Sequence, residues 1–134
     1  MKFSIYQINF TKEQVVEINN TDLSDYSNAP DFYMARLQTT ESYGTDPRER
    51  IETVQKYSRF YSHVANIEAS DLDEVFEIGN IGPERKIERL APMHSVSVGD
   101  VITVDSVNGQ IAFIVASEGF VEIPSSDAFF KEAA

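Results

Sequence analysis

The chain contains no cysteine among its 134 residues, and its only histidines are His63 and His94. Without cysteine, neither a disulfide nor a thiolate site can form. Two histidines argue against a histidine-rich zinc centre, so no metal ion or other cofactor is expected. No apolar run is long enough for a signal peptide or for crossing a bilayer, and we therefore expect a cytoplasmic protein without membrane contact.

Basic residues are also scarce, because 11 Lys and Arg stand against 22 Asp and Glu and give a net charge of −11. Direct binding of nucleic acid is not expected, since phosphate binding needs clustered cations. The charge is interpreted either as a solubilising surface, which we favour, or as mimicry of a phosphate backbone toward a DNA-binding protein. The densest acidic run lies in residues 68–77, where a helix capped by Ser70 gives its acids a local structural role.

What remains is an ordinary globular composition, with 42% apolar and 25% charged residues. Alternating apolar and β-branched residues predict strands. They are expected at residues 2–8, 32–37 and 60–67 and through the last third of the chain. There, Asn108-Gly109 between two apolar runs predicts a β-hairpin, with strand again at residues 120–123.

Capping and stop signals predict four short helices. Their expected starts are Thr11, which has capping-box spacing to Gln14, then Asp46-Pro47, Ser70 and Gly82-Pro83. Gly79 is expected to end the third helix and Pro92 the fourth. Helices and strands mix without regular alternation, so the predicted class is α+β. We expect one small domain over residues 1–126, with a mixed or antiparallel sheet and three to four short helices, and a short tail at 127–134.

Residues 94–100 read His-Ser-Val-Ser-Val-Gly-Asp and are followed by Asn108-Gly109 and by Gly-Phe-Val-Glu at 119–122. With the opening Phe-Ser-Ile-Tyr-Gln-Ile at 3–8, this pattern resembles the YodL-like domain, whose members carry His-Ser-Leu-Ser-Val-Ser/Gly-Asp, a hairpin and a closing Gly-Phe. The resemblance covers the first eight residues and about half of the chain from Tyr61. It implies an accessory protein of phages or integrative elements, associated with antirestriction, and no named reaction.

The loop that carries this motif is the main candidate site. His94, Ser95, Ser97 and Asp100 place an imidazole, two hydroxyls and a carboxylate within seven residues. These groups can recognise a small ligand or a partner peptide, or they can satisfy backbone groups at the corner, as Ser and Asp commonly do. Adjacent His and Ser rarely meet in productive geometry, and no Gly-x-Ser-x-Gly elbow is present, so no catalytic residue is expected.

A basic cluster precedes the loop at Arg85, Lys86 and Arg89. Beside the polar loop it can hold an anionic ligand such as a nucleotide phosphate. Alternatively, it pairs with Glu84 and Glu88 on a helix surface. Arg85 and Arg89 are therefore included among the predicted ligand-binding residues.

These observations and the resemblance lead to one expected function and two alternatives. The expected protein counters host defence in the bacterial cytoplasm by binding a defence protein or its signalling nucleotide, without turnover. One alternative is a small hydrolase or transferase that acts on a phosphorylated small molecule through His94. The other is a structural virion or assembly protein, which would form a homo-oligomer.

Overall fold

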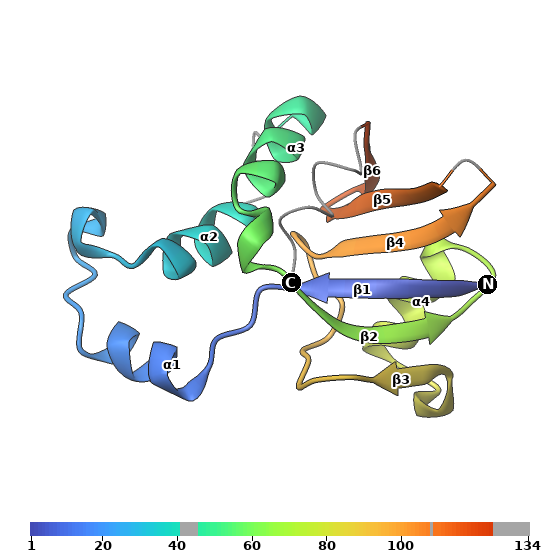
Figure 1. Ribbon diagram of the computed structural model, residues 1–134, viewed down its shortest axis with the longest axis horizontal. Coiled ribbons are helices and arrows are strands. Elements are labelled where there is room, and N and C mark those ends of the chain that lie inside the picture. Colours follow the sequence, from blue (N-terminus) through green and yellow to red (C-terminus); the bar gives the residue numbers. More distant parts are fainter. Residues whose placement is uncertain (41–45, 108, 125–134) are drawn as a thin grey trace.

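A six-stranded antiparallel sheet forms the centre of the protein (Figure 1). We describe it from a computed structural model, over residues 1–40, 46–107 and 109–124. In these residues the strands lie in the order β3-β2-β1-β4-β5-β6, and each strand runs antiparallel to its neighbours. The predicted α+β class and the C-terminal hairpin are therefore confirmed. The expectations for Asn108 and for the tail at 127–134 lie outside the described residues.

The described residues contain six strands and four α-helices. The strands are β1 (Lys2–Gln7), β2 (Ser62–Glu68), β3 (Ile87–Arg89), β4 (Val101–Ser106), β5 (Gly109–Ala116) and β6 (Gly119–Ile123). The α-helices are α1 (Lys12–Asn19), α2 (Asp31–Thr40), α3 (Pro47–Lys56) and α4 (Leu72–Asn80). Short 3-10 turns lie at Tyr26–Asn28, Ser58–Phe60 and Glu84–Lys86.

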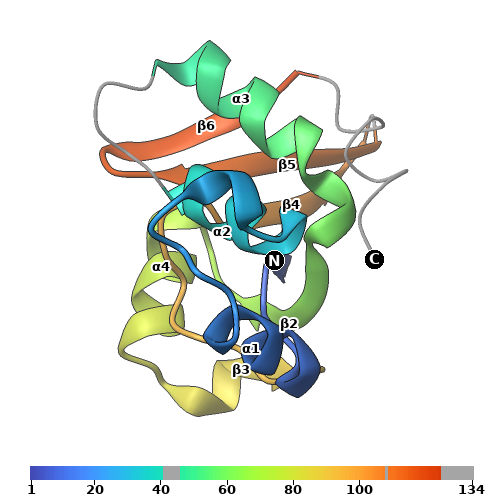
Figure 2. The ribbon, with the colours of Figure 1, turned by 90° about the vertical axis from the view of Figure 1, so that its left-hand side faces the viewer.

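Each face of the sheet carries its own hydrophobic cluster, because successive residues of a strand point to opposite sides. On one face, Phe3 and Ile5 of β1 join Val75 of α4, and this helix lies behind the sheet in Figure 1. On the other face, Ile114 of β5 joins Val54 of α3 in a second cluster. Figure 2 shows α1, α2 and α3 gathered at one end of the sheet, with α1 the farthest from the strands in Figure 1.

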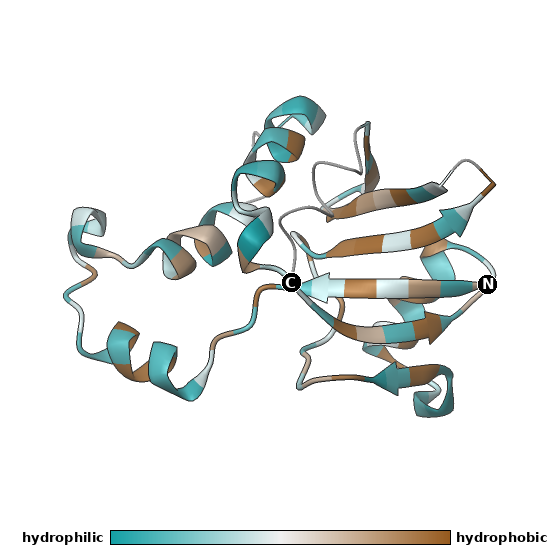
Figure 3. Ribbon diagram, viewed as in Figure 1, coloured by the Kyte–Doolittle hydropathy of each residue, from teal (hydrophilic) through white to brown (hydrophobic). Residues whose placement is uncertain are grey.

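Polar side chains occupy the second face where α2 and α3 do not cover it. Figure 3 shows that apolar and polar residues alternate along β1, which places most of its polar side chains on one face of the strand. We name this region the open sheet face and define it by five side chains from four neighbouring strands: Ser4, His63, Asn66, Glu88 and Thr103. The two faces therefore differ in chemistry, with one sealed by α4 and the other partly polar.

Two predicted helix starts are confirmed by their cap geometry. Thr11 accepts a hydrogen bond from Gln14 N, and the Gln14 side chain accepts one from Thr11 N, which completes the capping box. Asp46 accepts from Glu49 N at 2.8 Å, with Pro47 at the first helical position. Side-chain bonding local in the sequence thus fixes the beginning of α1 and of α3.

The strand predicted at residues 32–37 is wrong, because this segment is part of α2. Pro30 O accepts hydrogen bonds from Tyr33 N and Met34 N, and these bonds start a helix. The buried side chains of α2 are Ala35 and Thr39, which lie four residues apart on one helical face. A six-residue run of aromatic and aliphatic side chains fits both periods, so periodicity alone does not separate strand from helix there.

The helix predicted to start at Ser70 is confirmed as α4, but the predicted capping residue and the predicted end at Gly79 are wrong. Asp71, not Ser70, accepts from Glu74 N and caps the helix. Gly79 lies inside α4, which continues to Asn80. A Cβ at Gly79 would lie 2.2 Å from Cγ2 of Val96, so the glycine allows the following loop to pass close to the helix.

The helix predicted from Gly82-Pro83 to Pro92 is also wrong. The segment contains a 3-10 turn at Glu84–Lys86 and then the short edge strand β3. Ile87 of β3 lies opposite Ile67 of β2 and packs against the cluster under α4. Pairing with β2 therefore outweighs the local helical spacing, a common outcome where a segment can complete a sheet edge.

Candidate functional site

The predicted loop crosses the α4 face of the sheet, from the edge strand β3 to β4 in the interior. Its centre, Val96, is buried in the cluster under α4. Asn80 Nδ2 donates to Val96 O at 3.0 Å, which ties the loop to the end of the helix. The position of the motif thus depends on packing against α4 rather than on the strands it connects.

Gln7, at the end of β1, holds the loop on its other side. This side chain is fully buried. Its Oε1 accepts from His94 N at 3.2 Å, and its Nε2 donates to His94 O at 3.0 Å and to Asp100 Oδ2 at 2.9 Å. Sequence reasoning missed Gln7, although a signal was present: a polar residue on the same face of β1 as Phe3 and Ile5.

Asp100 is buried, with 5% of its surface exposed. Its Oδ2 accepts from Ser97 N at 2.9 Å as well as from Gln7. Burial raises the pKa of the Asp100 carboxyl to about 7, against the opposing effect of these hydrogen bonds. The carboxyl therefore closes the corner from inside and does not face solvent.

His94 is partly buried, and its two ring nitrogens differ. Nδ1 lies 2.7 Å from Ser95 O, a contact that assigns the ring proton to Nδ1. Nε2 is buried, lies 3.9 Å from Asp100 Oδ1, and has no hydrogen-bond partner within the described part of the chain. Burial lowers the pKa of the imidazole, so the ring is neutral at pH 7.

The two serines of the motif do not form a nucleophile pair with the imidazole. Ser97 Oγ donates to Ser95 O at 2.7 Å, so this hydroxyl stabilises the loop itself. His94 contacts the carbonyl of Ser95 rather than its hydroxyl. A serine nucleophile needs a base within hydrogen-bond reach of its hydroxyl, and this geometry does not supply one.

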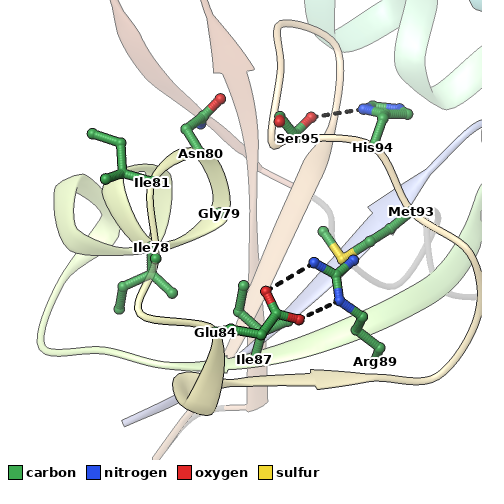
Figure 4. A pocket seen from close by; sticks show the side chains of 11 residues that line it. Ile78, Gly79, Asn80, Ile81, Glu84, Ile87, Arg89, Met93, His94 and Ser95 are labelled. Atoms are coloured by element: carbon green, nitrogen blue, oxygen red, sulfur yellow. Dashed lines mark hydrogen bonds and ion pairs between the residues drawn. The ribbon is translucent and has the colours of Figure 1, made fainter.

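A hollow of about 240 Å³ lies between the end of α4 and the segment that leads into the loop (Figure 4). Its walls include Ile81, Glu84, Arg89, Met93, His94 and Ser95. We call it the α4 hollow. It brings together three of the six predicted site residues, Arg89, His94 and Ser95. Asp100 and Ser97 do not line it.

The Arg89 guanidinium in the α4 hollow is already paired. Its Nε and Nη2 donate to the two carboxylate oxygens of Glu84 at 2.5 and 3.0 Å, as Figure 4 shows. The pair lowers the pKa of Glu84 and raises that of Arg89, mainly through their hydrogen bonds. The charge of the Arg89 guanidinium is therefore balanced by Glu84, and an anion entering the hollow would compete with Glu84 for it.

The structure places Arg85 elsewhere, in a separate hollow of about 460 Å³ that also includes Lys2 and Lys86. The two predicted arginines are thus not brought together. Glu68 and Glu88 line the same hollow. Their charges oppose the binding of a phosphate group at this position.

No helix in residues 1–40, 46–107 and 109–124 is long and apolar enough to cross a membrane. Within the same residues, no group of three or more His, Asp or Glu side chains is arranged to hold a metal ion. His63 stacks on Tyr6, with ring centroids 5.1 Å apart, and belongs to the open sheet face rather than to the loop. No family model, curated protein or solved structure matches the chain.

Proposed function

We propose that the chain is an accessory protein of a phage or mobile element, and that it counters host defence by binding a defence protein without turnover. The resemblance of the His-Ser-Val-Ser-Val-Gly-Asp motif to the YodL-like domain supports this origin. The geometry of the motif supports binding over catalysis, because Ser97, Asp100 and His94 Nδ1 make internal hydrogen bonds. A protein that only binds does not need these groups as reagents.

The observation that carries the proposal is the exposure of Ile81 at the α4 hollow. Its side chain is 85% exposed directly after the last turn of α4. In Figure 4 it stands beside Asn80, on the far side of the hollow from His94 and Arg89. An apolar anchor next to polar groups that can form hydrogen bonds is typical of the centre of a protein interface.

The hollows favour a protein partner over a signalling nucleotide. Pockets for drug-sized ligands enclose roughly 300 to 1,000 Å³, and the α4 hollow, at about 240 Å³, falls below this range. Its arginine is paired with Glu84, while the larger hollow at Arg85 contains Glu68 and Glu88. At both places a phosphate would compete with carboxylates that already lie beside the cations.

The test compares Ile81→Asp with Val107→Asp, because both wild-type side chains are large, apolar and exposed. Each variant is expressed in a bacterial host that carries a defence system against an infecting phage. Wild type is expected to raise the efficiency of plating, and Ile81→Asp to lose most of this effect, since a carboxylate in an apolar interface centre remains unpaired. Val107→Asp, at the hairpin tip, should act as wild type does.

The same two variants are used as bait for co-purification from that host. One stoichiometric partner should be retained by wild type and Val107→Asp and lost by Ile81→Asp, with binding that weakens as salt screens the −11 charge. Equal protection of the phage by Ile81→Asp and wild type would show that the α4 hollow is not the binding surface. Absence of protection by wild type in every defence-positive host would overturn the proposed function itself.

A second candidate, turnover of a phosphorylated small molecule through His94, is favoured by one observation. His94 lines the α4 hollow, and its Nε2 has no hydrogen-bond partner among the described residues. If this imidazole acts as a base, His94→Ala should abolish release of inorganic phosphate from such substrates, whereas Ile81→Asp should retain it. Loss of phage protection in Ile81→Asp together with full protection in His94→Ala would exclude this candidate.

A further inference from the structure

The open sheet face carries a row of polar side chains that runs across four strands. In the sheet register, Glu88 lies opposite Asn66, Asn66 opposite Ser4, and Ser4 opposite Thr103. Ser4 Oγ donates to Asn66 Oδ1 at 3.1 Å, and Asn66 Nδ2 donates to Glu88 Oε1 at 2.6 Å. The chain of hydrogen bonds therefore points from Ser4 toward the sheet edge, and Ser4 keeps its acceptor lone pairs for another donor.

Thr103 breaks this row. Its side chain is 1% exposed, and Oγ1 has no hydrogen-bond partner in the described residues. Buried hydroxyls are nearly always paired, because an unpaired one costs desolvation energy without return. Thr103 lines a hollow of about 160 Å³ together with Ser4, His63 and Asn66. An unpaired, buried hydroxyl thus lies in the wall of this hollow.

Two opposite charges line the same hollow one row further along the strands. Lys2 lies two residues before Ser4 on β1, and Asp105 two residues after Thr103 on β4. No salt bridge joins Lys2 or Asp105 to another described side chain. The stacked pair of Tyr6 and His63 lies on the other side of the Ser4 row.

The spacing of these groups defines the size of a ligand. Residues two apart on a strand are about 6.6 Å apart, so the charged row and the hydroxyl row can be spanned by a molecule of a few heavy atoms. The hollow supplies one charged and one uncharged donor, Lys2 and Thr103. It also supplies one charged and one uncharged acceptor, Asp105 and Ser4. A nucleotide is too large for about 160 Å³, whereas a small molecule that carries both charges can contact Lys2 and Asp105 at once.

We propose that this hollow binds a small zwitterion of the α-amino acid class. The ligand carboxylate accepts from Thr103 Oγ1 and pairs with the Lys2 ammonium, and the ligand ammonium pairs with Asp105 and donates to Ser4 Oγ. The site lies on the opposite face of the sheet from the α4 hollow, so it is independent of the proposed binding of a defence protein.

The proposal is tested by titrating the isotope-labelled protein with each of the twenty free amino acids at millimolar concentrations and recording amide chemical shifts. At least one amino acid should shift residues 2–4 and 103–105 in a saturable manner. Acetate and methylamine each carry one of the two charges and serve as probes of the zwitterion requirement. Neither should bind with comparable affinity, because each can contact only one of the two charges.

Variants at Thr103 test the hydroxyl directly. Thr103→Val should weaken binding about tenfold, the equivalent of one hydrogen bond to a charged group, whereas Thr103→Ser should stay close to wild type. Thr53→Val is the matched control, because the Thr53 hydroxyl on α3 donates to Glu49 O and does not line the hollow. Unshifted spectra with all twenty amino acids, equal binding of acetate, or unchanged affinity in Thr103→Val would each overturn the proposal.

Discussion

Two regions use polar side chains in opposite ways: the loop corner, formed by residues 94–100 and Gln7, and the open sheet face. At the corner, Gln7 and Asp100 bind each other and the backbone of residues 94–97, and both the amide nitrogen and the amide oxygen of Gln7 are used inside the protein. On the open sheet face, the row that starts at Glu88 ends at Thr103, whose hydroxyl has no partner among the described residues. The first arrangement fixes a fold, and the second leaves a buried hydroxyl unpaired among the described residues.

Both arrangements are supplied by one strand. Gln7 and Ser4 are three residues apart on β1 and therefore point to opposite faces of the sheet. The motif of residues 94–100 lies on the same side of the sheet as Gln7, where most of its polar groups form hydrogen bonds within the protein. A cluster of reactive side-chain types in the sequence is therefore a weak guide to a site until the partners of each group are known.

The largest expected effect comes from breaking the corner with Gln7→Leu. This change keeps the size of a fully buried side chain but leaves the backbone N and O of His94 without their partner and removes one of two donors to the Asp100 carboxyl. Unpaired buried groups cost about 1 to 3 kcal/mol each, and more if charged, so the free energy of unfolding should fall by about 3 to 5 kcal/mol. Urea denaturation followed by circular dichroism measures the change.

The same substitution at Gln14 is the control. Gln14 contributes one half of the capping box of α1, and Gln14→Leu should cost only about 0.5 to 1 kcal/mol. If Gln7→Leu and Gln14→Leu destabilise the protein equally, Gln7 is not the organising contact of the corner. The comparison then loses its first member.

Local signals in the sequence were sufficient for elements that are determined locally. Thr11 and Asp46 mark true helix starts because their caps involve residues three positions away. They failed where a partner distant in sequence decides the structure. Ile87 is a strand residue because Ile67 lies beside it, and Gly79 is not a stop because Val96 packs on it.

The candidate site was foreseen in part for the same reason. Arg89, His94 and Ser95 do meet in one hollow, whereas Arg85 lies at another. The importance of Gln7 depends on the loop residues that packing brings to it, and that of Thr103 on the side chains that β-pairing places beside it. Gln7 has a visible signal in the alternation of β1, but the missing partner of Thr103 has none.

The second prediction concerns how the stability contributed by Asp100 at the loop corner depends on pH. The folded-state pKa of Asp100 is raised to about 7, well above the value near 3.9 expected for an unfolded Asp. Between these values the folded protein holds a proton that the unfolded chain has released, so the contribution of Asp100 to stability decreases as pH rises toward 7. The slope is about 1.4 kcal/mol per pH unit.

The measurement is the difference in free energy of unfolding between wild type and Asp100→Asn at several pH values. Asparagine preserves the acceptor for Gln7 and Ser97 but does not titrate. From pH 5 to pH 8, wild type should lose about 2 to 3 kcal/mol relative to the variant. The lowered pKa of His94 gives a slope of the opposite sign in both proteins. A constant difference across this range would contradict a buried, protonated Asp100.

The smallest effect, with the opposite sign, is expected from Thr103→Val, because it removes the hydroxyl of the open sheet face that is unpaired among the described residues. Valine has the shape of threonine and suits a strand, and it eliminates a buried hydroxyl that lacks a partner in the described residues. The free energy of unfolding without ligand should rise by about 1 kcal/mol.

Thr39→Val is the control at an equally buried threonine whose hydroxyl donates to Ala35 O at 2.8 Å, and it should lower stability by about the same amount. A stabilising Thr103→Val that also loses amino-acid binding would separate the two roles of polar groups in this protein, because the same hydroxyl would then cost stability and contribute to binding. Destabilisation of both variants would mean that the Thr103 hydroxyl is already satisfied and that the open sheet face, like the corner, is structural.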